Sequence, residues 1–221
     1  MRTLVIDTST ERGIIAFLKG QDLLYHCDLP FGFQNSQHLL PSLQNGIDMI
    51  GKEWHHLDFI TVGVGPGSYT GIRVGVITAK TLSFARSIPL VGVCSLDGFL
   101  PCQDGPFASI IDAKIGGIYV QRGMHKNGTI YRTHEPQVFP LTHLASLMNE
   151  NCLLVTPNAS QLKTKAEIQT LPNVRWHECY PSPQHLAAIA SQKFARGEVS
   201  LDGRLELLYM RKTQAEIDRS H

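Results

Sequence analysis

Two aspartates, each at the end of an apolar run, are the residues best suited to carry chemistry in this chain. Asp7 closes the run Leu4–Asp7 and Asp112 closes the run Ser109–Asp112, and each run is typical of a buried strand that turns at a glycine into a second strand. Carboxylates at the ends of two such strands can hold Mg²⁺ and nucleotide phosphates, as in a small-molecule kinase or an ATPase. The alternative is that each carboxylate accepts hydrogen bonds from neighbouring backbone, the usual role of an isolated aspartate.

A glycine-rich loop, Gly65-Pro66-Gly67-Ser68, is the second feature that could do chemistry. It joins an apolar run beginning at Ile60 to a helix expected over Thr70–Ser87, and such a loop can present free N–H groups to an anion. A Walker loop needs a lysine that this loop lacks, and a dinucleotide fingerprint needs a third glycine and an acid about 20 residues later. The sequence therefore favours a structural turn, with Ser68 or Thr70 capping the helix.

Histidines and cysteines form no recognisable site in the sequence. The 10 histidines include no pair at helical spacing, so the pattern of a zinc hydrolase is missing, and no G-x-S-x-G elbow is present. The 5 cysteines are scattered without a C-x-x-C motif, which favours reduced thiols in a cytoplasm over a disulfide framework or a zinc module. We predict no metal site.

Composition limits the classes of partner. The 221 residues are 43% hydrophobic and carry 20 basic against 19 acidic side chains, so the net charge is +1. The balance of charges provides no basic surface with which the chain could bind nucleic acid unaided, so any contact with RNA is expected to be local or to depend on a partner. No apolar run approaches the ~18 residues that a membrane span requires, and no signal-peptide core follows Met1. We predict a cytoplasmic protein.

The helix expected over Thr70–Ser87 has almost no charged face, since Arg73 and Lys80 share one narrow sector. A surface helix normally shows one apolar stripe opposite a charged face, so this helix is expected to be covered twice. Its small residues cluster on one side, where they could let a second body approach closely: Gly71, Gly75, Thr78, Ala79 and Ala85. A protein partner and burial inside this same chain are equally compatible with the pattern.

The order of the remaining elements predicts an α/β fold with two lobes. A helix is expected over Ser36–Gly51, capped by Ser36, with a core stripe of leucines and isoleucines and with Pro41 either kinking it or marking its first turn. Further strands are expected over Gly13–Lys19, Leu23–Asp28, Leu90–Cys94 and Leu153–Thr156, and further helices over Leu96–Leu100, Thr142–Asn149, Ser160–Thr170 and Ser182–Gly197. Because the strand–aspartate–glycine pattern occurs twice, we predict two related lobes: a first lobe over residues 1–101, and a second, reduced lobe with a C-terminal tail over residues 102–221. Both aspartates are expected to face a shared cleft.

Several motifs together resemble the bacterial TsaB (YeaZ) family. They are Ile6-Asp7-Thr8-Ser9-Thr10, Leu39-Leu40-Pro41, Gly65-Pro66-Gly67-Ser68-Tyr69-Thr70-Gly71-Ile72-Arg73, Gly92-Val93-Cys94-Ser95-Leu96, Asp112-Ala113-Lys114 with Gly116 and Tyr119, and Tyr209-Met210-Arg211. The resemblance covers the whole chain, densely to about residue 120, and the glycine-loop motif is the specific part. The chain departs from the family at Asn35, Gly117 and Leu207.

The resemblance implies an actin-like fold of the ASKHA, ribonuclease H-like class, and a degenerate paralogue of TsaD, the subunit that transfers threonylcarbamoyl to adenosine in tRNA. It implies a non-catalytic organising subunit that docks on TsaD through its first two helices, joins the ATPase TsaE, and forms a homodimer when alone. No histidine occurs over Ser95–Leu100, where the catalytic paralogue binds metal, and old glycoprotease labels find no support in these residues.

The site residues follow from the helices and from the cleft. The expected partner interface comprises Leu39, Leu43, Ile47, Ile50, Gly71, Val74, Gly75, Thr78, Ala79 and Leu82. The expected cleft, with no cofactor beyond a weakly held nucleotide, comprises Asp7, Thr8, Ser9, Gly65, Gly67, Ser68 and Asp112. No catalytic residue is expected, and Gly75→Arg or Ala79→Glu is expected to break the complex without unfolding the chain.

Overall fold

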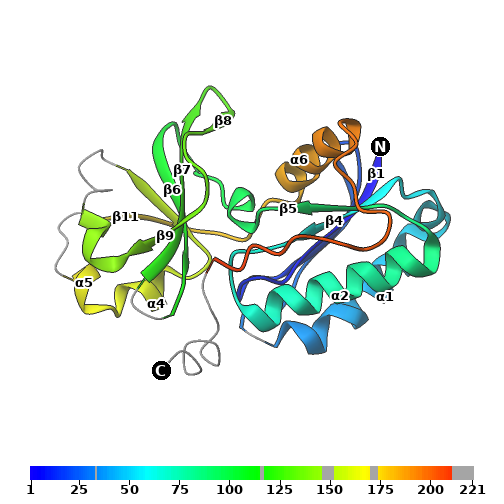
Figure 1. Ribbon diagram of the computed structural model, residues 1–221, viewed down its shortest axis with the longest axis horizontal. Coiled ribbons are helices and arrows are strands. Elements are labelled where there is room, and N and C mark those ends of the chain that lie inside the picture. The colour runs from blue at the N-terminus through cyan, green and yellow to red at the C-terminus, as the bar shows by residue number, and fades with distance from the viewer. Residues whose placement is uncertain (33, 115–116, 146–151, 170–173, 211–221) are drawn as a thin grey trace.

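The computed structural model describes residues 1–32, 34–114, 117–145, 152–169 and 174–210, which form two β-sheets lying side by side (Figure 1). The first sheet has the strand order β3-β2-β1-β4-β5, and the second the order β11-β10-β6-β7-β8. No helix among these residues is both long and apolar enough to cross a membrane. The chain thus forms two α/β lobes.

The first lobe is built around β1, which is buried on both of its faces. The strands are β1 (Arg2–Asp7), β2 (Ile14–Lys19), β3 (Asp22–Asp28), β4 (Phe59–Gly63) and β5 (Leu90–Val93). β1 pairs with β2 in antiparallel and with β4 in parallel orientation. Because side chains alternate along a strand, Leu4 and Ile6 enter one core while Val5 enters another. A central strand that is buried on both faces requires both faces of its sheet to be covered, and helices cover both faces here.

Three long helices cover the first sheet. α1 (Asn35–Ile50) and α2 (Tyr69–Arg86) pack on one face, and α6 (Pro183–Ala195) packs on the other (Figure 1). Leu186, Ala187 and Ala190 of α6 enter the same core as Val5 and Phe59. The strands divide as the predicted boundary at residues 101 and 102 requires, but the assignment of α6 to the second lobe is wrong, because its apolar stripe is buried against the first sheet.

The second lobe repeats the strand arrangement of the first. Its strands are β6 (Gly105–Asp112), β7 (Gly117–Lys126), β8 (Thr129–Arg132), β9 (Gln137–Pro140), β10 (Leu153–Thr156) and β11 (Arg175–Glu178). β6 takes the place of β1, with the antiparallel β7 on one side and the parallel β10 on the other. The predicted duplication is therefore confirmed, and with it the two-lobed, actin-like fold. Sequence analysis missed the short strands β8, β9 and β11.

The helices of the second lobe are short where the structure describes them. α4 (Ala159–Lys163) and α5 (Ala166–Gln169) replace the single helix expected over Ser160–Thr170, and Thr164 ends the first of them. The helix expected over Thr142–Asn149 lies largely outside the described residues, and its described start is a 3-10 turn, η3 (Leu141–His143). Two further 3-10 turns are η1 (Gly51–His56) and η2 (Ser95–Gly98).

Two of the three long helices, α2 and α6, begin with a serine side chain that caps the helix N-terminus. The Ser68 side chain accepts a hydrogen bond from the Gly71 N–H at the start of α2, and Ser182 does the same for His185 at the start of α6. The predicted cap Ser36 is wrong, because α1 begins after Gln34 without a side-chain cap. Pro41 lies inside α1, in its second turn.

After α6 the chain returns across the first lobe as an extended segment, Arg204–Met210, which we call the strap (red in Figure 1). The Leu208 N–H donates to the Val64 carbonyl, 2.9 Å away, just beyond the end of β4. Leu205, Leu207 and Leu208 pack against the core under α1 and α2. Residues 211–221, which follow the strap, lie outside the described residues.

Candidate functional site

The glycine loop is closed against the turn that follows β1. The Ser68 N–H donates to the Ser9 carbonyl at 2.7 Å, and the Thr8 hydroxyl donates to the Gly71 carbonyl at 2.7 Å. A side chain on Gly67 or Gly71 would collide with the backbone carbonyls of Ser9 and Thr8. The glycines are therefore required by close packing of two backbone segments.

Hydrogen bonds inside the protein already use several N–H groups of this loop. The Gly65 N–H donates to the Ser95 hydroxyl at 3.3 Å, and the Gly71 N–H donates to the Ser68 hydroxyl at 3.2 Å. Together with the Ser68 N–H, these donors are directed at protein acceptors. An anion would have to displace those partners, so the geometry favours the structural role of the loop.

The two aspartates occupy equivalent strand ends but have different surroundings. Asp7 is 2% exposed, its Oδ1 accepts from the Ser9 N–H at 2.8 Å, and its Oδ2 has no hydrogen-bond partner among the described residues. Burial raises the pKa of Asp7, although hydrogen bonds from Ser9 partly oppose it. Asp112 accepts from the Lys114 N–H at 2.8 Å and forms ion pairs with Lys165 at 3.0 Å and Lys114 at 3.8 Å.

Each aspartate therefore caps the backbone two residues ahead, which is the structural alternative raised by the sequence. Ser9, which donates to Asp7, belongs to the first lobe, and Lys114 and Lys165, which contact Asp112, belong to the second. Over the described ranges, no group of three or more histidine, cysteine, aspartate or glutamate side chains is arranged to hold a metal ion. The structure supports two separate caps more than one shared magnesium site.

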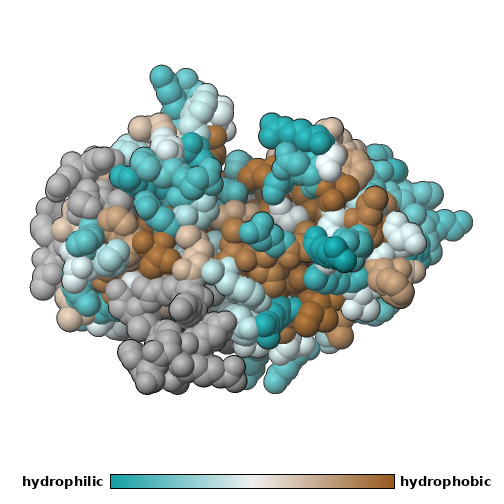
Figure 2. All heavy atoms as spheres, in the orientation of Figure 1, coloured by the Kyte–Doolittle hydropathy of each residue, from teal (hydrophilic) through white to brown (hydrophobic). Residues whose placement is uncertain are grey.

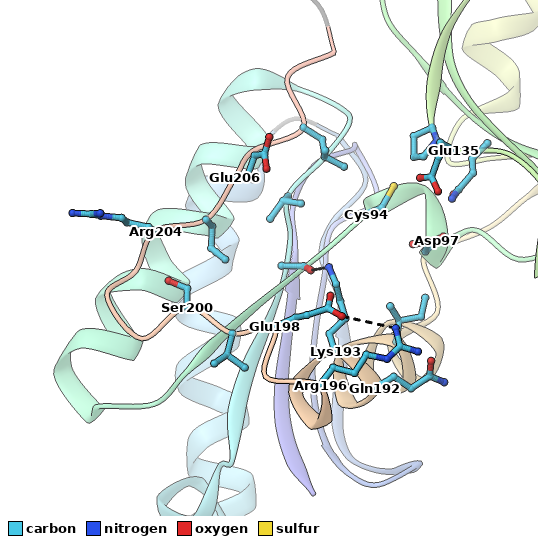
Figure 3. Close-up of a pocket in the computed structure, with 18 of the residues that line it drawn as sticks. Cys94, Asp97, Glu135, Gln192, Lys193, Arg196, Glu198, Ser200, Arg204 and Glu206 are labelled. Atoms are coloured by element: carbon cyan, nitrogen blue, oxygen red, sulfur yellow. Dashed lines mark hydrogen bonds and ion pairs between the residues drawn. The ribbon is translucent and has the colours of Figure 1, made fainter.

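A cavity of ≈ 870 Å³ lies between α6, the strap and the second lobe (Figure 3). Cys94 and Asp97 lie on one side of it, Lys193 and Arg196 project from α6, and Glu206 comes from the strap. Its other polar lining residues are Gln121, Glu135, Gln192, Glu198, Ser200 and Arg204. Sequence analysis missed this cavity because its walls come from segments that are far apart in the chain.

The charges in this cavity are largely compensated within the protein. Asp97 pairs with Arg132 at 3.2 Å, and burial raises the pKa of Asp97 while Arg132 opposes that rise. The Lys193 ammonium donates to the Gly92 carbonyl at 2.8 Å, and Arg196 pairs with Glu198 at 3.8 Å. Burial raises the pKa of the Cys94 thiol to about 12, which keeps it protonated and unreactive at neutral pH.

A second hollow, of ≈ 460 Å³, runs between α1 and α2 and is mainly apolar. We call it the helix groove, and it is lined by Ser36, Leu39, Leu40, Tyr69, Thr70, Arg73, Val74, Ile77 and Thr78. Leu40 is 59% exposed and Ile77 is 61% exposed, and Phe84, seven residues after Ile77 on the same helical face, is 91% exposed. Large apolar side chains gathered on one exposed face mark a surface for another macromolecule.

Comparison with known proteins identifies the family to which this geometry belongs. Residues 34–197 match the family model TsaD, described as tRNA N6-adenosine threonylcarbamoyltransferase. A Bacillus subtilis protein named tRNA threonylcarbamoyladenosine biosynthesis protein TsaB is 33% identical over 156 residues, which cover 68% of this chain and 67% of the relative. The chain belongs to the TsaB (YeaZ) family.

Two further comparisons extend this result. The TsaB protein of Escherichia coli is 29% identical over 127 residues, so the match spans 54% of this chain and about half, 53%, of that relative. The solved structure of YeaZ from Pseudomonas aeruginosa matches with a TM-score of 0.74 at 23% identity, covering 94% of this chain and 99% of that one. A second Pseudomonas aeruginosa structure, whose title notes similarity to peptidase YEAZ, has a TM-score of 0.75. These likenesses confirm the fold.

In this TsaB-family chain, the small-residue side of α2 faces inward, contrary to the sequence expectation. Gly75 and Ala79 are buried, and a Cβ on Gly75 would lie 2.6 Å from the Thr8 hydroxyl oxygen. The substitutions Gly75→Arg and Ala79→Glu would therefore disturb the fold and cannot isolate a partner contact. The glycines allow α2 to approach its own lobe.

The other predicted interface residues divide between core and surface. Leu39 and Leu43 are buried in the core, and only the edge of Leu39 lines the helix groove. Half-buried positions are Ile47, Ile50, Gly71, Val74, Thr78 and Leu82. The residues that sequence analysis missed are Leu40, Tyr69, Ile77 and Phe84, which together present the exposed apolar surface. The spacing of Ile77 and Phe84, opposite Gly75 and Ala79 on the wheel, was the available signal.

Proposed function

We propose that this chain is the non-catalytic organising subunit of the bacterial tRNA threonylcarbamoyladenosine synthase, and that its helix groove docks on TsaD. Two findings support the proposal: membership of the TsaB family, and an exposed apolar face on the first two helices. The single observation that carries it is the exposure of Leu40 and Ile77 at the helix groove, with Phe84 exposed further along the same face of α2.

The physical basis of docking is the removal of this face from water. Burying a large apolar side chain contributes about 1.5–3 kcal/mol relative to leaving it exposed. Leu40 and Ile77 at the concave groove, with Phe84 beside it on α2, provide the apolar centre that stable interfaces need, and the groove also carries the hydroxyls of Ser36, Thr70 and Thr78. A standard interface of about 1,600 Å² would extend beyond the groove along both helices.

The surroundings of the cleft residues support a subunit without catalysis of its own. Asp7 and Asp112 accept hydrogen bonds from their own chain, and the glycine loop is packed against Thr8 and Ser9. In this proposal the subunit acts by stabilising the arrangement of TsaD and by helping to form the surface that TsaE recognises. Contact with tRNA then comes through TsaD.

The direct test is Ile77→Glu, because Ile77 is exposed and its replacement leaves the core intact. We expect the affinity for TsaD of the same organism to fall about thirtyfold or more, the size of a hot-spot residue, with an unchanged melting temperature. Tyr131→Glu is the matched control, since Tyr131 is 54% exposed on β8 of the other lobe. Gel filtration and calorimetry measure the binding. Undiminished co-elution of Ile77→Glu with TsaD would overturn the docking surface.

We propose that the same face also mediates self-association when TsaD is absent. Two copies that meet through the helix groove would leave it closed to TsaD, so we propose that homodimer and heterodimer compete. Sedimentation of the isolated chain should show a dimer that Ile77→Glu converts to monomer and that TsaD dissociates.

The rival function is that of a small-molecule kinase or ATPase. It requires Mg²⁺-dependent turnover of ATP by the isolated chain, and this turnover should be lost in Asp7→Ala. Such turnover would refute the non-catalytic role.

A further inference from the structure

The strap joins the two hollows of the molecule. Its Leu208 N–H is bonded to the Val64 carbonyl, and the Leu208 carbonyl oxygen lies 3.3 Å from where a Gly65 side chain would begin. Leu205 and Leu208 line the interlobe cavity while they pack against the first-lobe core, and Met210 packs against a core cluster that contains Phe107 of the second lobe. Hydrophobic residues gather near the middle of this face, where the strap crosses (Figure 2).

One residue of the strap, Tyr209, is held by the start of α2. Its ring lies against the Tyr69 ring with centroids 4.8 Å apart, and its hydroxyl oxygen accepts a hydrogen bond of 3.1 Å from Arg73 Nε. The Arg73 guanidinium in turn lies 3.9 Å from the centroid of the Tyr69 ring. Stacking and a cation–π contact thus tie Tyr209, Tyr69 and Arg73 into one unit.

Tyr69 and Arg73 belong to this unit and also line the helix groove. The other side of the strap is a wall of the interlobe cavity, where Glu206 and Arg204 are placed opposite Cys94 and Glu135 (Figure 3). One short segment therefore contacts the residues that a docking partner must meet and also closes a cavity on the far side of β4.

We propose that the strap is a positioning element for the docking surface: Tyr209 holds Tyr69 and Arg73 in the orientation in which they line the helix groove. This inference rests on the proposed function, in which TsaD is the partner that binds the helix groove. Coupling between two sites is reciprocal, so a partner that favours the held orientation must also tighten the strap across the cavity. Docking at the groove and closure of the cavity then strengthen each other.

The first experiment compares three variants in their binding to TsaD. Tyr209→Ala should lower the affinity about tenfold, within the usual range of such couplings, although Tyr209 itself does not line the groove. Tyr209→Phe should retain part of the affinity because its ring still stacks on Tyr69. Leu201→Ala, a change at a residue that is 79% exposed just before the strap and lines neither hollow, should bind like the original chain. Equal affinity of all three variants would overturn the proposal.

The second experiment uses the unaltered chain and asks whether docking reaches the strap. Hydrogen exchange of the Leu208 amide should slow when TsaD is added, because that N–H is bonded to Val64 only while the strap is seated. Tyr209→Ala should remove this slowing at saturating TsaD. Unchanged exchange at Leu208 would refute the coupling. If the unaltered chain does not bind TsaD at all, the proposed function fails instead, so the two failures are distinguishable.

Discussion

The two lobes share a strand order but put it to different uses. In the first lobe, α1 and α2 cover one face and α6 the other, and the outer side of α1 and α2 exposes Leu40, Ile77 and Phe84. In the second lobe, the described helices α4 and α5 have 5 and 4 residues. Among the described residues, an apolar groove between two long helices therefore lies over the first sheet, where α1 and α2 provide its walls. Strand topology positions the helices, and the residues on their outer faces decide the function.

The difference extends to the aspartate that ends each central strand. Asp7 is buried with one carboxylate oxygen lacking a hydrogen-bond partner among the described residues, whereas Asp112 is neutralised by Lys114 and Lys165. A duplicated motif does not imply duplicated chemistry, because its surroundings set the charge that it can carry. Three sets of variants can break or sharpen this comparison.

The largest effect is expected at α6, which belongs to the first lobe in space and to the second half in sequence. Leu186→Ala should destabilise the fold by about 3 kcal/mol, because Leu186 is fully buried against Val5 and Val91. Hydrogen exchange should show the loss of protection in β2 and β5 first. Leu154→Ala in the second-lobe core is the matched control and should expose β6 and β10. Loss of protection in the second sheet on Leu186→Ala would contradict this placement.

The next effect separates the two aspartates by sign. Asp7→Asn should raise the free energy of unfolding at pH 7 by about 1 kcal/mol, because it removes a buried carboxyl group whose ionised form is disfavoured by burial. Asp112→Asn should lower it by about 1 kcal/mol, because two ion pairs with lysines are lost. Chemical denaturation of both variants measures the difference. Equal signs would show that the surroundings of the two strand ends are energetically alike.

The pH dependence gives a separate check on Asp7. Its pKa in the folded chain is raised above the ordinary 3.8, mainly by burial, so the folded state holds the proton more tightly than the unfolded state. Stability from this group therefore falls as pH rises from 3.8 through the folded pKa and stays lowered above it. Asp7→Asn should gain stability relative to the original chain over that window. A constant difference across it would refute the assignment.

The sequence predicted the long elements because their periodicity is strong. β1, α2 and α6 were found from apolar runs, from the caps Ser68 and Ser182, and from the glycine after α6. It could not assign which side of α2 faces out, because Gly75 and Ala79 suit a tight helix–sheet contact as well as a partner. The side of α2 that carries Gly75 faces inward because Thr8 lies against Gly75, and this contact joins residues that are far apart in the chain. The interlobe cavity could not be predicted either, because its lining residues also come from segments that are far apart in the chain.

The smallest effect is expected at a link between the lobes. Arg12, from the turn after β1, donates to the Pro157 carbonyl and to the Glu178 carboxylate of the second lobe, and its guanidinium lies 4.7 Å from the centroid of the Tyr180 ring. Arg12→Met keeps the apolar stem and should cost about 1 kcal/mol or less, since Glu178 is partly exposed. Exchange of the Ala159 amide, which donates to Glu178 at 2.7 Å, should rise slightly.

The loss of stability at acidic pH tests this link between Arg12 and Glu178, however small its contribution to the free energy of unfolding. Partial burial would raise the pKa of Glu178, but the Ala159 N–H and Arg12 outweigh it and hold the pKa below 4.5. Stability from this carboxylate is therefore present above pH 4.5 and is lost as pH falls through the lowered pKa. Arg12→Met should reduce this loss of stability only in part, because the hydrogen bond from the Ala159 N–H to Glu178 remains. Glu178→Gln should abolish the loss. A loss of stability at acidic pH that is unaffected by either variant would refute the lowered pKa of Glu178 and its dependence on Arg12.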